Sequence, residues 1–541
     1  MIFPNGKNDK MLNLRFLESG IVRLHGPLGS LLDKVVENRL NKIDYRLLAD
    51  PFRYRNEADG KWRCEFWGKV VRSAVYVWRS TQDPELKTII DTTVCDLLST
   101  QTSDGCISSY PESRQLDGWD IWGRKYVLLA LLAYYREMNP DPGLLEKIRK
   151  CCLHLVRQAG ELQNYGLHYG MAAASALRAV AETAVLCGDG ELMSAAVKLA
   201  ESGCCHLHNI FTSARIGVPP AEIANGKAYE MTSCFQGLAA LYAADHDAAK
   251  LETLIRYYRM VLEKELFITG GGGLKDANGE FWYSGAARQC RTDCGGMGET
   301  CITATWLWFG AAMLRLTGDS TIADDMERSF YNALLGAFQP DGSNVTHINP
   351  FLCGGWKHPA ADQMPDFPGQ DCCRAQGPYG LSLAPLTAVM KTDGGYAVNL
   401  YEDLTAEGIL KITGGYPASD KAVITVLKDG EFELALRIPR DFGCHVDGHA
   451  VSGGTYHGLK RQWQTGDRIE LEFDFSPRIE ELNGMTAALC GPLVMCRERG
   501  GKPGRSVLRS CCGKVDYASA GKGFVQENTL TVWENTPRCA D

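Results

Sequence analysis

Between about residues 30 and 390 the sequence repeats one unit, a pair of helices joined by a short polar turn. Two of the expected helices, at 126–135 and 302–311, are apolar on nearly every face, as helices enclosed on all sides must be. Successive turns lie roughly 50 to 70 residues apart, the length of two helices and their connections. The turns fall at 82–86, 139–142, 188–190, 245–247 and 317–319.

Helical hairpins repeated in this way form either an open solenoid or a closed toroid. Solenoids have near-constant repeats and polar caps, whereas the loops here vary in length and several are rich in Trp, Tyr and Gly. We therefore expect residues 29–391 to form an (α/α)6 barrel with a mouth lined by loops.

After residue 392 the periodicity changes to two, which is typical of strands. We expect residues 392–541 to form a β-sandwich, and the strand-like segment within residues 1–28 could pair with it. The fold class is thus mainly α with β, an (α/α)6 barrel followed by a β-sandwich. Many carbohydrate-active enzymes share this arrangement, although a fold alone does not give a function. The expected strands are 396–401, 409–412, 422–427, 432–438 and 469–475.

The net charge and the cysteine content of the chain limit the kinds of partner and compartment that we expect. The 541 residues carry a net charge of −8, which argues against nucleic acid or an anionic membrane as a partner. The 21 cysteines are scattered through a chain large enough to need no disulfide framework, and residues 1–10 lack the apolar core of a signal peptide. We expect a reduced, cytoplasmic protein, although a leader removed ahead of this sequence would leave the same pattern. A homodimer remains an open alternative.

Three short segments contain residues that can bind a metal or carry out acid–base chemistry: Gly279-Glu280-Phe281, Glu299-Thr300-Cys301 and Asp371-Cys372-Cys373. Zinc binds thiolates and carboxylates in a tetrahedron, and a thiolate held by zinc stays ionised, the form of cysteine that attacks. Adjacent cysteines alone are weak support, since the chain has other such pairs. The loop at 366–378, however, is polar and rich in Gly and Pro, which does not suit a buried core.

Each of these acids also has a simpler explanation. Glu299 could be a first-turn acid that the helix dipole favours, and Glu280 could be a solvated loop carboxylate. Aromatic residues in the same kinds of loop, among them Trp67, Tyr110 and Trp122, could stack on sugar faces or could pack in the core.

The chain resembles glycoside hydrolase family 127, the β-L-arabinofuranosidases, over most of its length. The resemblance implies that Glu299, Cys301, Cys372 and Cys373 bind Zn2+. It further implies that Cys372 is the nucleophile and Glu280 the general acid/base of a retaining exo-glycosidase acting on a small oligosaccharide. The family fold agrees with the one expected from the repeats. The motifs that carry the resemblance are Phe66-Trp67-Gly68-Lys69, 100–110, 268–271, Gly279-Glu280-Phe281, Glu299-Thr300-Cys301, 327–332, Asn349-Pro350 and Cys372-Cys373.

Positions that would contact the sugar depart from the family pattern: Gly123 and Lys227 replace histidines, and His347 replaces a tyrosine. We expect substrate contacts at Trp67, Tyr110, Trp122, Lys227 and His347. The same chemistry on a different sugar is one alternative, and Lys227, Arg124 and Arg374 could favour an acidic one or could be surface cations. A carbohydrate-binding protein with a structural zinc site is another alternative. A zinc-activated water attacking a different bond is a third.

Overall fold

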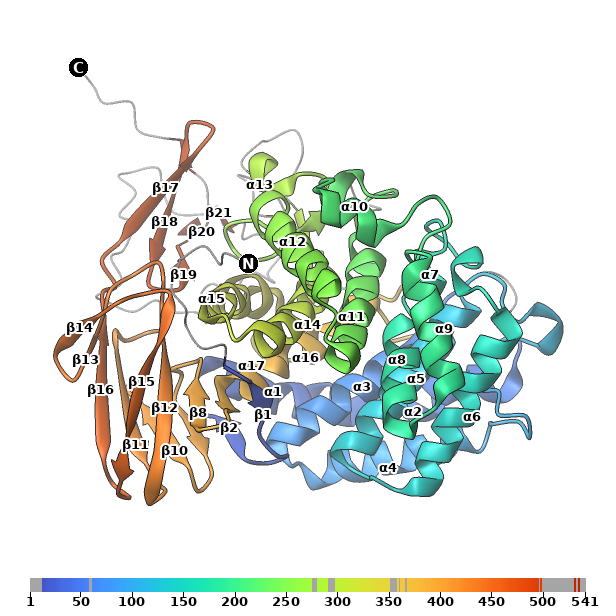
Figure 1. Ribbon diagram of the computed structural model, residues 1–541, viewed down its shortest axis with the longest axis horizontal. Helices are drawn as coiled ribbons and strands as arrows, with labels where there is room; N and C mark the ends of the chain where they lie inside the picture. The colour runs from blue at the N-terminus through green and yellow to red at the C-terminus, as the bar shows by residue number, and fades with distance from the viewer. Residues whose placement is uncertain are drawn as a thin grey trace.

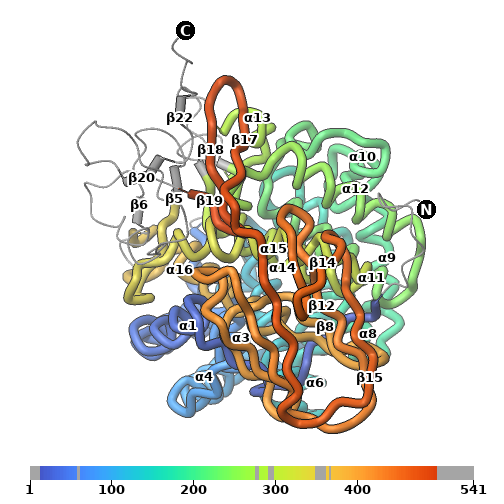
Figure 2. Tube along the Cα trace, turned by 90° about the vertical axis from the view of Figure 1, so that its left-hand side faces the viewer, coloured from blue at the N-terminus to red at the C-terminus, as the bar shows by residue number. Residues whose placement is uncertain are grey.

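The computed structural model describes residues 12–57, 61–274, 280–289, 297–350, 358–359, 361–364, 367–495, 497–498, 530–531 and 534–535. Two bodies are visible in Figure 1, a helical barrel on the right and a β-sandwich on the left. In Figure 2 the strands of the sandwich lie in front of the barrel. Within the described residues, no helix combines the length and the apolar character needed to cross a membrane.

The barrel is a closed ring of inner helices. Each contacts the next, and α16 packs against α3 to close the ring, which confirms the expected (α/α)6 barrel. The inner helices are α3 (Cys64–Thr81), α5 (Asp120–Glu137), α8 (Leu177–Cys187), α11 (Ala228–Asp245), α14 (Thr300–Thr317) and α16 (Cys372–Leu381). The helices α1 (Pro27–Asn38), α4 (Pro84–Leu98), α6 (Pro142–Ala159), α9 (Gly190–Glu201), α12 (Ala248–Lys264) and α15 (Ser320–Arg328) cover them from outside.

The polar turns that mark the repeat in the sequence are start signals for the outer helices. In each turn an aspartate precedes an outer helix and accepts a hydrogen bond from a backbone N–H of the first turn, the usual N-cap arrangement. These aspartates are Asp83, Asp141, Asp189, Asp247 and Asp319. Five of the six outer helices therefore begin with an aspartate cap, and α1, which follows Gly26, has no side-chain cap.

The sandwich consists of two sheets, and the N-terminal segment contributes a strand to each. Strand β1 (Arg15–Phe16) pairs with β7 (Val389–Lys391), and β2 (Val22–Leu24) pairs with β9 (Leu404–Ala406). One sheet continues from β7 through β8 (Gly395–Val398) and β12 (Gly430–Ile438) to β15 (Thr455–Trp463). The other runs from β9 through β10 (Leu410–Thr413), β11 (Lys421–Val426), β16 (Arg468–Phe473) and β13 (Cys444–Val446) to β14 (His449–Val451).

A buried ion-pair network joins the sandwich to the barrel. Arg437 of β12 is completely buried and its guanidinium pairs with Asp324 and Glu327 of α15. The Arg437 Nε atom also donates to the Asn399 carbonyl at 2.7 Å, and the Tyr416 hydroxyl donates to Glu327. Buried charges persist only when they are paired in this way, so the network fixes how the two bodies meet.

Candidate functional site

The four candidate zinc ligands meet at the N-terminal ends of two inner helices, α14 and α16. Cys301 is the second residue of α14, and Cys372 and Cys373 open α16. Glu299 is the N-cap residue of α14 and has an extended backbone, with φ −114° and ψ 135°. The change from extended to helical backbone lets Glu299 and Cys301 face the same point although they are only two residues apart.

Asp371 determines where α16 begins. Its carboxylate accepts hydrogen bonds from the backbone N–H groups of Cys373 and Arg374, at 2.7 and 3.1 Å. Cys372 therefore occupies the first helical position, where the positive end of the helix dipole stabilises an anion.

The four residues form a compact donor set. One ligand atom from each of Glu299, Cys301, Cys372 and Cys373 lies within 4.8 Å of all the others, and all four residues are buried. The Cys373 sulfur lies 3.6 Å from Glu299 Oε1 and 3.3 Å from the Cys301 sulfur. The second distance is far longer than the ~2.0 Å of a disulfide, so the cysteines are free thiols.

The pKa of one of these four acids is lowered, and the pKa of the other three is raised. Hydrogen bonds from Cys301 and Cys373 lower the pKa of Cys372 well below its usual value, against the effect of burial. Burial raises the pKa of Glu299, Cys301 and Cys373. Among the described residues, Glu299 Oε2 is buried with no hydrogen-bond partner. Four crowded acidic donors with an orphaned oxygen among them fit a bound cation.

Glu280 is held opposite α11 by a short ladder. Its carbonyl accepts a hydrogen bond from Ala228 N–H at 2.8 Å, and Lys227 pairs with Phe281 across the antiparallel bridge. The Lys227 ammonium lies 2.7 Å from Glu280 Oε2, and the Glu280 side chain is 24% exposed. Burial, the largest single effect, raises the pKa of Glu280, but the Lys227 charge together with hydrogen bonds to Lys227 and Glu299 lowers it overall.

His347 lies beside the donor set on β5 (Thr346–Pro350). Its Nδ1 atom is 2.8 Å from Asp371 Oδ2, and its Nε2 atom is 3.7 Å from Glu299 Oε1. Burial lowers the pKa of the imidazole, but the hydrogen bond to Asp371 and the Cys372 charge raise it to about 9.

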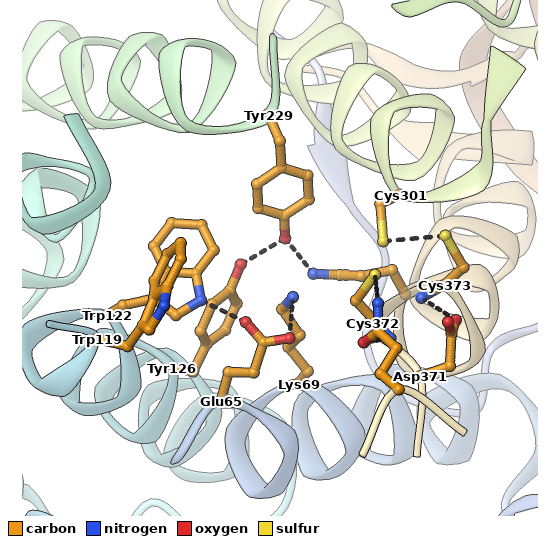
Figure 3. Close-up of polar contacts among 12 residues, drawn as sticks. Glu65, Lys69, Trp119, Trp122, Tyr126, Tyr229, Cys301, Asp371, Cys372 and Cys373 are labelled. Atoms are coloured by element: carbon orange, nitrogen blue, oxygen red, sulfur yellow. Dashed lines mark hydrogen bonds and ion pairs between the residues drawn. The ribbon is translucent and has the colours of Figure 1, made fainter. Parts of the chain in front are cut away.

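Polar and aromatic side chains lie beside the cysteines in the barrel interior (Figure 3). The Lys69 ammonium lies 2.8 Å from Glu65 Oε1 and over the faces of the Tyr126 and Tyr229 rings. The Trp122 indole N–H donates to the Glu65 carboxylate. Trp122 therefore contacts Glu65 in the barrel interior, and its predicted role in sugar binding stays a prediction; Glu65 was not identified from the sequence as a site residue.

Two of the expected sugar contacts lie elsewhere. Trp67 is completely buried and its indole N–H donates to Thr93 of α4 at 3.0 Å, so its ring packs on the outer face of α3. Tyr110 is 1% exposed, and its hydroxyl donates to the Lys61 carbonyl and accepts from the Trp119 N–H. Both side chains are part of the core packing, so the expectation that they contact sugar was wrong.

Gln363 is a site residue that the sequence pattern did not reveal. Its amide oxygen accepts from the Cys372 backbone N–H at 3.0 Å, and its amide nitrogen donates to the Cys372 sulfur at 3.5 Å. It lies in a polar loop with no periodic pattern, so only its proximity to Cys372 in sequence could have indicated it.

Two profiles of one known protein family match most of the chain. The family profile for the catalytic domain of GH127 β-L-arabinofuranosidases matches residues 30–381, and the profile for the middle domain of the same family matches residues 397–475. The chain belongs to glycoside hydrolase family 127. The matched residues include the whole donor set, Glu280 and Lys227.

Individual GH127 proteins are distant in sequence but similar in fold. A non-reducing end β-L-arabinofuranosidase of Bifidobacterium longum subsp. longum is 23% identical over 314 residues, which are 52% of this chain and 47% of the relative. The match thus spans about half the length of that curated relative.

Two solved structures agree over most of the chain. A GH127 β-L-arabinofuranosidase from Geobacillus stearothermophilus T6 has a TM-score of 0.68 at 19% identity, covering 88% of this chain and 86% of the other. A second GH127 β-arabinofuranosidase has a TM-score of 0.71 at 18% identity, covering 90% and 86%. At these identities the likeness establishes the barrel-and-sandwich fold.

Proposed function

We propose that this GH127 protein is a retaining exo-glycosidase that releases a terminal L-arabinofuranose-like sugar from a small oligosaccharide. Cys372 is the nucleophile, Glu280 is the general acid/base, and Glu299, Cys301, Cys372 and Cys373 are ligands of Zn2+. The observation that carries the proposal is the placement of Cys372 at the N-terminus of α16 and inside the buried donor set, with Glu280 as a separate, partly exposed carboxylate at the same site.

The donor chemistry and one of the two donor distances support zinc as the ion; the Cys301 and Cys373 sulfurs, at 3.3 Å, are closer than the roughly 3.8 Å between two thiolates of a tetrahedral zinc site. Bonds of about 2.1 Å to oxygen and about 2.3 Å to sulfur place those two ligands roughly 3.6 Å apart in a tetrahedral site. The Cys373 sulfur and Glu299 Oε1 are 3.6 Å apart. A bound zinc ion supplies the positive charge that keeps the cysteine ligands as thiolates.

The chemistry is a double displacement. In the first step the Cys372 sulfur bonds to the anomeric carbon while the glycosidic C–O bond breaks, and Glu280 gives its proton to the leaving oxygen. In the second step the Glu280 carboxylate takes a proton from water, whose oxygen displaces sulfur from the same carbon. Two inversions return the original configuration, as in retaining glycosidases with a carboxylate nucleophile.

The Lys227 ammonium favours one half of this cycle. At 2.7 Å it stabilises the carboxylate form of Glu280, which is the base needed in the second step. The protonated form needed in the first step is correspondingly disfavoured. Substrates with poor leaving groups, which depend most on that proton, should be limited by the first step.

Recognition of an acidic sugar has little support. Lys227 is paired with Glu280, Arg124 with Asp120, and Arg374 with Asp362. Cations that already have carboxylate partners inside the protein have little to gain from a second carboxylate on the ligand. We therefore propose a neutral pentofuranose as the sugar that this site binds.

A structural zinc site in a carbohydrate-binding protein is the competing function, because a closed set of four donors is typical of such sites. The deciding experiment is a panel of aryl glycosides that includes both anomers of L-arabinofuranose and other pentoses. Turnover of the β-L-arabinofuranoside, with the β product seen first by NMR, would support the retaining enzyme. No turnover across the panel by the zinc-loaded protein would favour the binding protein.

A further inference from the structure

His347 and Asp371 form a unit that ends at the donor set. Asp371 uses its two carboxylate oxygens for different purposes: Oδ1 caps α16, and Oδ2 lies 2.8 Å from His347 Nδ1. With Nδ1 engaged, the free ring nitrogen Nε2 points toward Glu299, 3.7 Å from its Oε1 atom. A carboxylate that fixes one histidine nitrogen and leaves the other for a metal is a common arrangement at metal sites.

The same residues also belong to a second donor group. Ligand atoms of His347, Asp371, Cys372 and Cys373 lie within 4.8 Å of one another, so this group shares both cysteines of α16 with the first. Near Cys372 and Cys373 the protein thus offers more donors than a tetrahedral ion can use at once.

A surplus donor matters because of the role proposed for Cys372. Once its sulfur is bonded to carbon it is a neutral thioether, a much weaker ligand for zinc than a thiolate. Glu299, Cys301 and Cys373 alone would then leave a dication with three ligands in a buried site.

We propose that His347, oriented by Asp371, is a further zinc ligand that occupies the position of Cys372 whenever Cys372 is bonded to sugar. The assignment rests on the proposed zinc–cysteine chemistry. His347 would then supply a nitrogen donor to the ion for as long as the Cys372 sulfur is bonded to sugar. The Nδ1 proton stays on the ring and is donated to Asp371, and binding of the ion at Nε2 releases the proton that this nitrogen carries in the imidazolium form.

Zinc affinity, measured by competition with a chromogenic chelator, tests the assignment without any turnover. The proteins compared are wild type, Cys372→Ser, His347→Phe and the double variant, with His457→Phe on strand β15 as the control histidine. Cys372→Ser should retain one zinc ion with affinity near wild type, because His347 replaces the lost sulfur. The double variant should bind at least roughly 100-fold more weakly than Cys372→Ser, with His457→Phe unchanged.

Cadmium NMR gives a spectroscopic signature that a merely structural histidine would not produce. In Cys372→Ser loaded with cadmium and isotope-labelled at histidine nitrogen, a one-bond coupling to a single imidazole should appear and should be absent from the double variant. Asp371→Asn in the Cys372→Ser background gives a second test, since Asn still caps the helix but cannot accept the same proton. It should weaken zinc binding roughly 10- to 100-fold.

The experiments distinguish failure of the His347 assignment from failure of the proposed function. Equal zinc affinity in Cys372→Ser and the double variant, with no imidazole coupling, would overturn the role of His347 and leave the proposed function standing. Wild-type protein that binds no zinc at all would overturn the proposed function and this inference together.

Discussion

The Lys227 ammonium forms an ion pair with Glu280, the proposed acid/base, at 2.7 Å. The two residues lie on facing segments that also share backbone hydrogen bonds, so the pair is built into the scaffold. A cation this close makes Glu280 a weaker base and a stronger acid than it would be alone.

Replacing Lys227 should therefore change the pH profile in a defined direction. Lys227 lowers the pKa of Glu280, so Lys227→Met should raise that pKa and keep the acid protonated to higher pH. The alkaline limb of the kcat/KM profile should shift upward, as measured with an aryl glycoside. The exposed Lys264→Met is the control, and a limb that stays in place or moves down would count against the assigned pair.

The proposed ligands should be needed for zinc stoichiometry. Glu299→Gln, Cys301→Ser and Cys373→Ser should each lose most of the bound zinc, as measured by elemental analysis after gel filtration. Each also leaves the remaining buried donors without their cation. The exposed Cys95→Ser is the matched thiol control and should keep one zinc per chain. Full zinc content in all three variants would place the ion elsewhere.

Gln363 should act on the nucleophile through its two hydrogen bonds to Cys372. Gln363→Ala removes an amide donor from the thiolate, a loss of about 1.5–3 kcal/mol for a charged acceptor, or roughly 10- to 100-fold in kcat. Zinc content should stay at the wild-type value, which separates this effect from loss of the metal. The control variant at the exposed Gln464, Gln464→Ala, should leave kcat unchanged. An unchanged kcat in Gln363→Ala as well would show that Gln363 does not act on the nucleophile.

The Arg437 network should govern the stability of the whole molecule. Arg437→Met leaves the buried carboxylates of Asp324 and Glu327 without their cation. Such a change typically lowers the free energy of unfolding by about 3–5 kcal/mol. Urea unfolding should show this loss, whereas the exposed Arg468→Met should stay within about 0.5 kcal/mol of wild type. If Arg437→Met lowered the free energy of unfolding by less than about 0.5 kcal/mol, the interface would be stable without the ion pairs.

The sequence predicted the barrel well because its signals are local. An aspartate before five of the six outer helices and apolar residues on nearly every face of 126–135 and 302–311 are properties of short segments, and the structure bears them out. Strand β15 was missed because most of its side chains are at least partly exposed, so it shows no clear period-two alternation of buried and exposed residues.

Which face of a helix looks inward could not be predicted. Trp67 and Lys69 are two residues apart on α3 and therefore point in nearly opposite directions. Lys69 faces the site and Trp67 faces the outer helices because of how α3 is rotated within the ring. That rotation depends on the contacts of α3 with α5 and α16. Sequence patterns alone could not tell the two apart.

The most direct test of the central claim is to trap the bond between sugar and Cys372. In Glu280→Gln, the second step lacks its base, so an aryl β-L-arabinofuranoside with a good leaving group should load the enzyme and stop. Mass spectrometry should then find one pentosyl residue per chain, on the peptide that contains Cys372. An adduct on another residue, or steady turnover of the same glycoside by Cys372→Ser, would contradict the account.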